Sequence, residues 1–235
     1  MPSPANAHID LLISDCDGVL IDSEIIAERV LHEALILRFP KDEVLQVLAG
    51  TFGLQGRDIL ARVERHFDVQ LPEAFRAELQ ARTEALLRDE VAVIPGARDA
   101  LMAIELPLAV ASNSHLAAVE RALRRCALTE RVNRGLFTAE QVARPKPAPD
   151  VYLLAAQSAG VEPARCLVIE DSTTGATAAL TAGMRVLGFL GASHIPPEHG
   201  EVLRQLGVEQ VFDDMRALPE LVARLRNTQP PYRQG

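Results

Sequence analysis

Four short segments of the chain carry side chains that could act together on a phosphorylated ligand. They are Asp15-Cys16-Asp17-Gly18, Ala111-Ser112-Asn113-Ser114, the stretch Arg144–Asp150 around Lys146, and Ile169-Glu170-Asp171-Ser172. We expect each segment to lie at, or just past, the end of an apolar strand. Carboxylates spaced by two residues project to the same side of an extended chain, so Asp15 and Asp17 could both meet one ligand.

The chemistry that fits these residue types is phosphoryl transfer. A phosphoryl group carries negative charge, so a carboxylate can approach it only if that charge is offset. Mg²⁺ held by Asp15 and Asp171 would supply much of the offset, because Mg²⁺ prefers hard oxygen ligands. Glu170 would ligate the ion directly or through water. Lys146 would add a positive charge, and Ser112 would donate a hydrogen bond to a phosphoryl oxygen.

Asp15 is the candidate nucleophile. An attacking carboxylate forms an aspartyl-phosphate, which splits one difficult step into two easier ones. Asp17 would protonate the leaving oxygen in the first step and deprotonate the attacking water in the second. For the first role Asp17 must hold a proton near neutral pH, which burial and a neighbouring carboxylate both favour.

Apolar strands that alternate with helices are expected to position these residues. The strands are expected over the runs Ile9–Ser14, Leu108–Ala111, Cys166–Ile169 and Arg185–Leu190. The helices are expected over Gly96–Ile104, Leu116–Ala127, Pro149–Ala159 and Thr173–Ala182. Strands separated by helices of this length predict right-handed crossovers. The predicted fold class is therefore α/β, with a doubly wound, Rossmann-like core around a parallel sheet.

The stretch from about residue 23 to residue 88 has a helical pattern and no strand-like run. Two apolar faces are expected, one from Ile25, Ile26, Val30, Leu31 and Leu35 and the other from Phe75, Leu79, Leu86 and Leu87. A structureless loop of this length would be unusual, so a separate helical domain is predicted. Because it follows the first strand, it would lie over the ligand-binding edge of the sheet. We expect a catalytic core of residues 1–22 and 89–235 and a helical cap of residues 23–88.

In their order along the chain, the four segments resemble the motifs of the haloacid dehalogenase-like (HAD) hydrolase superfamily. DCDGVL is similar to the first motif, and Ser112, Lys146 and Glu170-Asp171 are similar to the second, third and fourth. The insert resembles the helical cap of the branch that contains β-phosphoglucomutase and many sugar-phosphate phosphatases. The resemblance spans nearly the whole chain and implies a Rossmann-like core, an aspartate nucleophile, Mg²⁺ and a cap that opens and closes. It also implies that the carbonyl of Asp17, rather than its side chain, ligates the metal.

Substrate contacts are expected from Ser112, Asn113, Lys146 and Arg57. Arg57 is the only cation of the Gly-rich segment Gly50–Asp58, which is expected to be a cap loop able to reach the site. A solvated arginine at the start of a helix is the alternative.

Other polar residues near the four segments are expected to have structural roles. Ser114 and Ser172 are expected to cap or brace, and Asp22 and Ser23 to cap the first helix of the insert. His115 is expected on a helix surface. His194 lies in the segment Gly191–Gly200, where an ordinary Pro/Gly loop is favoured over a loop that presents the histidine to the rim of the site.

Composition excludes several other classes of protein. The formal net charge of −8 and the dispersed basic residues argue against nucleic acid as a partner, because phosphate neutralisation needs clustered Lys and Arg. The apolar runs are too short to span a bilayer, and the first ten residues do not form a secretory signal. Three scattered cysteines (Cys16, Cys126 and Cys166) favour a cytoplasmic location. A small phosphorylated metabolite is the expected partner.

The predicted function is Mg²⁺-dependent hydrolysis of a small phosphomonoester, either a sugar phosphate or a sugar-acid phosphate such as 6-phosphogluconate. A phosphomutase of the β-phosphoglucomutase type is the alternative, because it uses the same aspartates but returns the phosphoryl group to the substrate. Phe52 and Gly56 stand where the mutase pattern has a lysine and an arginine, which weakens that alternative, although Arg57 is one residue away. A dehalogenase would lack the second aspartate, and a phospho-receiver domain is about half this length.

Overall fold

The computed structural model describes residues 8–49, 51 and 56–227 of the chain. The chain divides into two compact units, Met1–Asp22 with Val93–Gly235 and Ser23–Ala92. The chain passes between them at Asp22–Ser23 and Ala92–Val93. The short strands β2 (Ile21–Asp22) and β3 (Ala92–Val93) pair with each other in a two-stranded sheet at these crossings.

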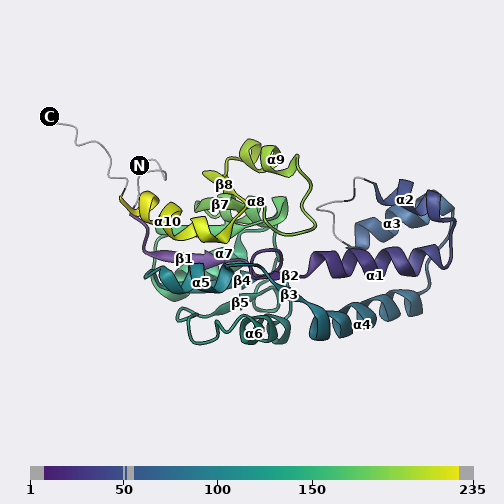
Figure 1. Cartoon of the computed structure of the whole chain (residues 1–235), viewed down its shortest axis with the longest axis horizontal. Helices are drawn as coiled ribbons and strands as arrows, with labels where there is room; N and C mark the ends of the chain where they lie inside the picture. Colours follow the sequence, from purple (N-terminus) through teal and green to yellow (C-terminus); the bar gives the residue numbers. More distant parts are fainter. Residues whose placement is uncertain (1–7, 50, 52–55, 228–235) are drawn as a thin grey trace. The chain divides into compact units, whose positions relative to one another are not determined.

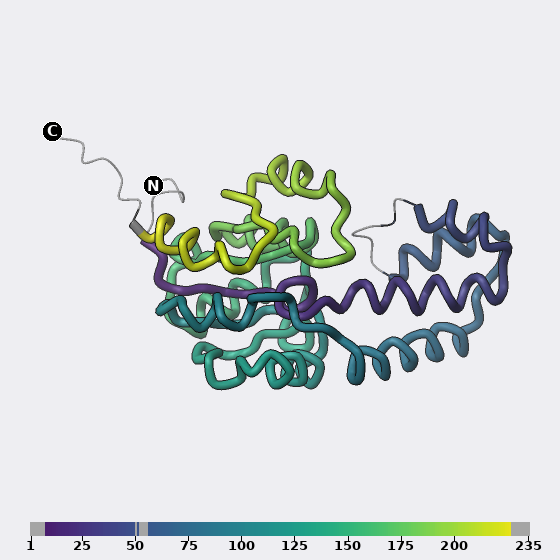
Figure 2. The backbone as a smooth tube through the Cα atoms, in the orientation of Figure 1, coloured from purple at the N-terminus to yellow at the C-terminus, as the bar shows by residue number. Residues whose placement is uncertain are grey.

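The larger unit is built on a six-stranded sheet in which every neighbouring pair is parallel. The strand order is β5-β4-β1-β6-β7-β8. The strands are β1 (Leu11–Ser14), β4 (Leu108–Ser112), β5 (Leu136–Thr138), β6 (Cys166–Glu170), β7 (Arg185–Phe189) and β8 (Gln210–Phe212). The chain adds strands first on one side of β1 and then on the other, so the topology reverses beside β1, which runs through the middle of this unit in Figure 2. The predicted doubly wound α/β fold is confirmed.

Helices cover both faces of this sheet. They are α5 (Ala97–Ala103), α6 (Leu116–Arg125), α7 (Asp150–Ala159), α8 (Thr173–Thr181), α9 (His199–Leu206) and α10 (Leu218–Asn227). In Figure 1, α5 and α10 lie on the near side of β1 and α7 on the far side. The strands β1, β4, β6 and β7 are buried along their whole length. Strands buried on both faces have no polar side to alternate with, which explains why the sequence shows them as continuous apolar runs.

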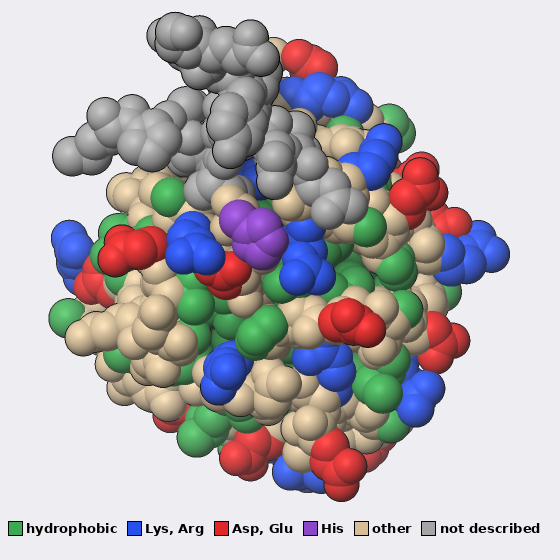
Figure 3. Space-filling model, turned by 90° about the vertical axis from the view of Figure 1, so that its left-hand side faces the viewer, with side chains coloured by type: hydrophobic (Ala, Val, Ile, Leu, Met, Phe, Trp, Pro, Cys, Tyr) green, Lys and Arg blue, Asp and Glu red, His purple; other side chains and the backbone are tan. Residues whose placement is uncertain are grey.

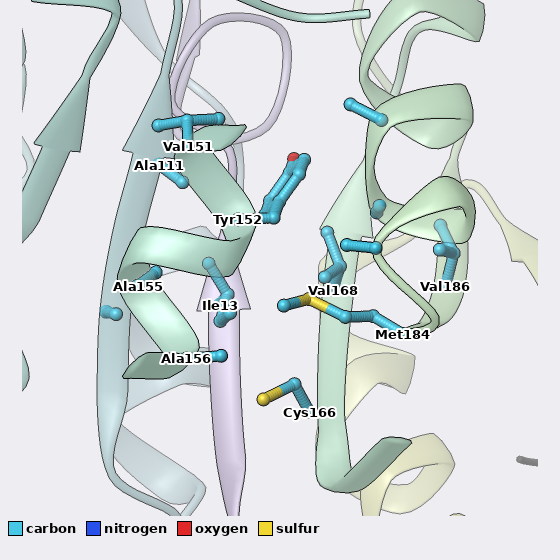
Figure 4. Close-up of a cluster of buried hydrophobic side chains, with 14 of the residues drawn as sticks. Ile13, Ala111, Val151, Tyr152, Ala155, Ala156, Cys166, Val168, Met184 and Val186 are labelled. Atoms are coloured by element: carbon cyan, nitrogen blue, oxygen red, sulfur yellow. The ribbon is translucent and has the colours of Figure 1, made fainter. Parts of the chain in front are cut away.

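The packing of α7 on the sheet also positions a polar group. Figure 4 shows Tyr152, Ala155 and Ala156 of α7 facing Ile13 of β1 and Val168 of β6. The Tyr152 side chain is fully buried, and its hydroxyl points towards the carboxyl ends of the strands. This helix therefore contributes both to the apolar core and to the polar edge of the sheet.

The smaller unit is helical, as the sequence predicts. Its helices are α1 (Glu24–Ile36), α2 (Lys41–Leu48), α3 (Gly56–Phe67) and α4 (Glu73–Glu90), and they share a hydrophobic cluster. The cluster includes Leu31, Leu35, Val63 and Phe75. The prediction that Ile25 belongs to the apolar face of the first helix is wrong, because Ile25 is 42% exposed. Helix α4 continues to Glu90, two residues beyond the expected end of the insert.

Several elements were not expected from the sequence. The strands β5 and β8 are only three residues long. The helix α9 begins at His199, inside the segment expected to be a Pro/Gly loop, and α3 begins at Gly56, inside the expected cap loop.

None of the helices that the structure describes is long and apolar enough to cross a membrane. Lys and Arg side chains lie among Asp and Glu on the face shown in Figure 3.

Candidate active site

Four of the predicted site residues meet at the carboxyl edge of three neighbouring strands. Asp15 follows β1, Ser112 ends β4, and Glu170 ends β6 with Asp171 directly after it. Strands β4 and β6 flank β1 on its two sides, so these side chains come together where the topology reverses. This is the position at which doubly wound sheets bind ligands.

Lys146 reaches the same edge from the segment between β5 and α7. Its ammonium group donates hydrogen bonds to Asp15 Oδ1 at 2.8 Å, Glu170 Oε1 at 2.7 Å and the carbonyl of Ala111 at 2.9 Å. The Lys146 side chain is only 4% exposed. Burial lowers the pKa of Lys146, but the carboxylates of Asp15 and Glu170 outweigh burial and raise this pKa well above its usual range. A buried, charged lysine with all three protons used is therefore a fixed part of the site.

The carboxylates at this edge outnumber the lysine. Asp15, Glu170 and Asp171 are all buried, and among the described residues they form a group whose ligand atoms lie within 4.8 Å of one another. Burial, followed by the charge of Glu170, raises the pKa of Asp15 to about 8 although Lys146 opposes the shift. A crowded acidic group of this kind is stabilised by a further cation. Three hard oxygen donors fit Mg²⁺.

Glu170 connects the lysine to the surrounding structure. Besides Lys146, its Oε1 accepts a hydrogen bond from the hydroxyl of Tyr152 at 2.7 Å. Its Oε2 accepts from the main-chain N–H of Ser172 at 3.2 Å and from the Ser172 hydroxyl at 3.0 Å. A Cβ at Gly175 would lie 1.7 Å from Glu170 Oε1, so only glycine leaves room for this carboxylate. These contacts indicate that the main role of Glu170 is to hold Lys146 in position.

The turn after β1 presses its main chain against Asp171. Gly18 has φ +73°, a conformation that side chains rarely adopt, and a Cβ there would lie 1.8 Å from Asp171 Oδ2. The turn is closed by hydrogen bonds from the Gly18 N–H to the Ile21 carbonyl and from the Leu20 N–H to the Cys16 carbonyl, both 2.8 Å long. The glycine of the DCDG segment is thus required both by the turn and by the closeness of a carboxylate.

The Asp17 carboxylate is held by two serines. Its Oδ2 accepts hydrogen bonds from Ser114 Oγ at 2.7 Å and from Ser112 Oγ at 3.2 Å. The Ser112 hydroxyl in turn accepts from the N–H of Ser114 at 2.9 Å. The side chain of Asp17 is therefore oriented towards the turn after β4, which leaves Asp15, Glu170 and Asp171 as the carboxylates of the metal-ligand group.

The structure gives Asn113 a structural contact and changes the roles expected of Ser23 and Asp22. Both polar atoms of the Asn113 side chain bind the main chain of Lys146, at 2.9 and 3.1 Å, so Asn113 positions the lysine segment. Ser172 caps α8 through Gly175, as expected, but Ser23 makes no side-chain capping bond to α1. Asp22 accepts hydrogen bonds from the N–H of Ser193 instead of capping that helix.

Two histidines beside Asp171 were not assigned to the site from the sequence. The His194 side chain is 6% exposed, and its Nε2 lies 3.5 Å from Asp171 Oδ2. The buried His199 places Nε2 2.6 Å from the main-chain oxygen of Asp171. The only indication in the sequence was the presence of both histidines in the Pro/Gly-rich segment Gly191–Gly200. An ordinary surface loop could have the same composition.

Arg57 belongs to the smaller unit and lies in the first turn of α3. Its side chain is 78% exposed and is 3.7 Å from Asp58. The expected loop is therefore wrong for Gly56–Asp58, which are helical, while Gly50 and residues 52–55 lie outside the described residues. A substrate contact of Arg57 stays a prediction.

A doubly wound sheet that gathers an aspartate, a buried lysine and an acidic pair at its switch point is an arrangement typical of enzymes that act on a phosphorylated ligand. A family model for haloacid dehalogenase-like hydrolases matches residues 9–183, and the chain belongs to this family.

Curated proteins and solved structures of this family are similar over most of the chain. The 6-phosphogluconate phosphatase of Escherichia coli is 29% identical over 92% of this chain and 95% of its own length. The fructose-1-phosphate phosphatase YqaB of the same organism is 30% identical over 74% of this chain and 92% of its own. A crystal structure of a HAD family hydrolase from Deinococcus radiodurans, with bound phosphate and sodium, is 32% identical with a TM-score of 0.79, and covers 94% of this chain and 97% of that chain.

Proposed function

We propose that this protein is a Mg²⁺-dependent phosphatase that hydrolyses a sugar phosphate or a sugar-acid phosphate through an aspartyl-phosphate on Asp15. The observation that carries the proposal is the buried Lys146, which joins Asp15 to Glu170 at the carboxyl edge of the sheet with Asp171 in the same group. Lysines are almost never fully buried unless they are paired, and a site that must accept a doubly charged phosphoryl group needs this offset of charge.

The residues present fit a magnesium ion. Asp15 and Asp171 would hold it, and Glu170 would contribute from beside Lys146 or through water, since its oxygens already accept hydrogen bonds from Lys146, Tyr152 and Ser172. When bound, Mg²⁺ supplies charge neutralisation for the carboxylates and the phosphoryl oxygens. The carbonyl of Asp17 is a further candidate ligand.

The reaction is proposed to run in two displacements on the chain's own residues. In the first, a carboxylate oxygen of Asp15 forms a bond to phosphorus, the bond from phosphorus to the substrate oxygen breaks, and Asp17 gives that oxygen a proton. In the second, water attacks the phosphorus of the aspartyl-phosphate, Asp17 takes a proton from the water, and the Asp15 carboxylate is released. Lys146 stays beside Asp15 in both steps.

The substrate class is supported by the relatives. One of them is a 6-phosphogluconate phosphatase that the chain matches over nearly its whole length, and another is a fructose-1-phosphate phosphatase. We propose that the helical unit acts as a cap and that Arg57 on α3 meets a distal anionic group of the substrate. The mutase alternative has less support, because Phe52 and Gly56 stand where the mutase pattern has its basic residues.

Hydrolysis of a panel of phosphate esters tests the proposed function. The panel contains 6-phosphogluconate, fructose 1-phosphate, glucose 6-phosphate and an aryl phosphate, assayed with Mg²⁺ and after EDTA treatment. We expect release of inorganic phosphate, the highest kcat/KM for a sugar or sugar-acid phosphate, and a loss on the order of 10²-fold or more without metal. Formation of an isomeric phosphosugar without phosphate release would favour the mutase, and full activity after EDTA would remove the metal from the proposal.

Replacing Asp17 by Asn is expected to slow the hydrolysis of sugar phosphates by about 10²–10⁴-fold, the usual contribution of a general acid. An aryl phosphate has a better leaving group that needs less protonation, so its hydrolysis should slow much less. The comparison of kcat for the two substrates in one variant corrects for any general damage to the site. Equal losses for both substrates would show that Asp17 does not act as the acid.

A further inference from the structure

The segment between β7 and α9 brings a buried histidine against the candidate metal ligand Asp171. Nε2 of His194 lies 3.5 Å from Asp171 Oδ2, and Nδ1 lies 3.8 Å from Asp22 Oδ1. The ring is therefore placed between two carboxylates, although its side chain is only 6% exposed. Both ring nitrogens therefore face carboxylate oxygens, so the surroundings of this ring are electrostatic as well as apolar.

The segment that carries His194 is itself held at several points. The N–H of Leu190 donates to the carbonyl of Phe212 at 2.7 Å. The N–H of Ser193 donates to the two Asp22 oxygens, at 3.2 and 3.4 Å. Asp22 therefore binds the main chain of Ser193 and lies 3.8 Å from Nδ1 of the neighbouring His194, so it holds the segment that carries the ring.

Asp171 is also confined by the turn after β1 and by a second histidine. Its Oδ2 lies so near the main chain of Gly18 that a Cβ there would be 1.8 Å away, and its main-chain oxygen lies 2.6 Å from His199 Nε2. Mg²⁺ requires ligand oxygens at about 2.0–2.1 Å in octahedral geometry, so the rotation of this carboxylate determines how well the ion is bound. Groups that orient a metal ligand commonly change metal affinity when they are removed.

We propose that His194 is a positioning residue: it holds the carboxylate of Asp171 in the orientation for ligating a divalent cation, and Asp22 holds the segment of His194 through the N–H of Ser193. The inference rests on the proposed function, since it assigns the support of that same metal site. His194 contacts neither the phosphoryl group nor the nucleophile in this assignment; it acts through Asp171.

Calorimetric titration of the full chain with Mg²⁺, without substrate, tests this assignment. We expect His194→Ala to weaken Mg²⁺ binding by about 10–100-fold, the range found for partners of metal ligands. The thermal unfolding temperature in EDTA is measured in parallel to separate folding from metal binding. His8→Ala is the matched control, because His8 also pairs with a carboxylate, that of Asp10, but lies before β1 at the opposite end of the strand.

Two polar replacements decide between positioning and bulk packing. The amide nitrogen of Gln takes approximately the place of Nε2, so His194→Gln should recover part of the Mg²⁺ affinity. The shorter Asn places its amide near Nδ1 and faces Asp22, so His194→Asn should bind Mg²⁺ several-fold more weakly than the Gln variant. Asp22→Ala should weaken binding in the same direction, and its effect should not add fully to that of His194→Ala, because the two side chains act in one chain of contacts.

The results separate this inference from the proposed function. Wild-type protein that neither binds Mg²⁺ nor hydrolyses phosphate esters would overturn both. Wild-type Mg²⁺ binding that His194→Ala leaves within about twofold would overturn only the role of His194. If the Ala variant does not fold, equal Mg²⁺ affinities in the Gln and Asn variants would overturn it.

Discussion

Asp15→Asn is expected to abolish phosphatase turnover, with kcat lower by about 10⁴-fold or more, as is usual when a nucleophile is lost. The fold should remain, because the replacement has nearly the same shape and removes a charge that burial and Glu170 already disfavour. The measurement is phosphate release from the best substrate with saturating Mg²⁺, accompanied by the unfolding temperature in EDTA.

Asp10→Asn is the matched control for Asp15→Asn. Asp10 lies just before β1, at the end of the strand opposite Asp15, and contacts His8 and Arg165 rather than the acidic group. We expect its kcat to equal that of the wild type. Retention of more than about a tenth of the wild-type turnover in Asp15→Asn would assign the nucleophile to another residue or to water.

Lys146→Met should affect both stability and activity. The change leaves Asp15 and Glu170 buried without their cation, and breaking a buried ion pair costs about 3–5 kcal/mol of the free energy of unfolding. Loss of this charge beside the phosphoryl group should also lower kcat by about 10²–10³-fold. Urea unfolding in EDTA measures the first effect, and steady-state kinetics with Mg²⁺ measures the second.

The loss of stability in Lys146→Met should depend on pH. Without the lysine, the folded-state pKa of Asp15 rises further above its unfolded value of 3.8, so the folded state holds a proton that the unfolded state releases. Below about pH 8 both folded proteins hold this proton, so the Asp15 part of the difference in stability should be small there and should grow as the pH rises above about 8. Lys41→Met is the control, because Lys41 is the only other lysine of the chain and is exposed at the start of α2. A difference that stays the same above pH 8 would show that Lys146 does not compensate the Asp15 carboxylate.

The strands that could be predicted are the ones buried on both faces. The strands β1, β4, β6 and β7 are continuous apolar runs, because helices cover the sheet on both sides. The strand β8 is three residues long at an edge of the sheet, and only its last residue, Phe212, is buried. A run of that length has no periodicity that distinguishes a strand from a turn.

The candidate site also has parts that could be predicted from the sequence and parts that could not. Asp15 and the Glu170-Asp171 pair could be predicted to lie together, because parallel strands bring their carboxyl ends to one edge whatever the details of packing. Lys146 reaches that edge from the long segment after β5, a strand that the sequence did not predict. A substrate contact of Asn113 stays a prediction, but the structural contact of its side chain with the main chain of Lys146, 33 residues away, could not be predicted. Nothing local in the sequence indicates that partner.

The sequence by itself determined the chemical groups of this protein and the edge at which they gather, since residue type and the order of strands and helices are properties of the chain. Only the tertiary structure decided how those groups are held. Tyr152 reaches Glu170 from α7, 18 residues away, and His194 reaches Asp171 from the segment after β7. Such contacts depend on where a helix or a loop packs against the sheet. That packing is set by the sum of many apolar contacts rather than by the spacing of the residues that it brings together.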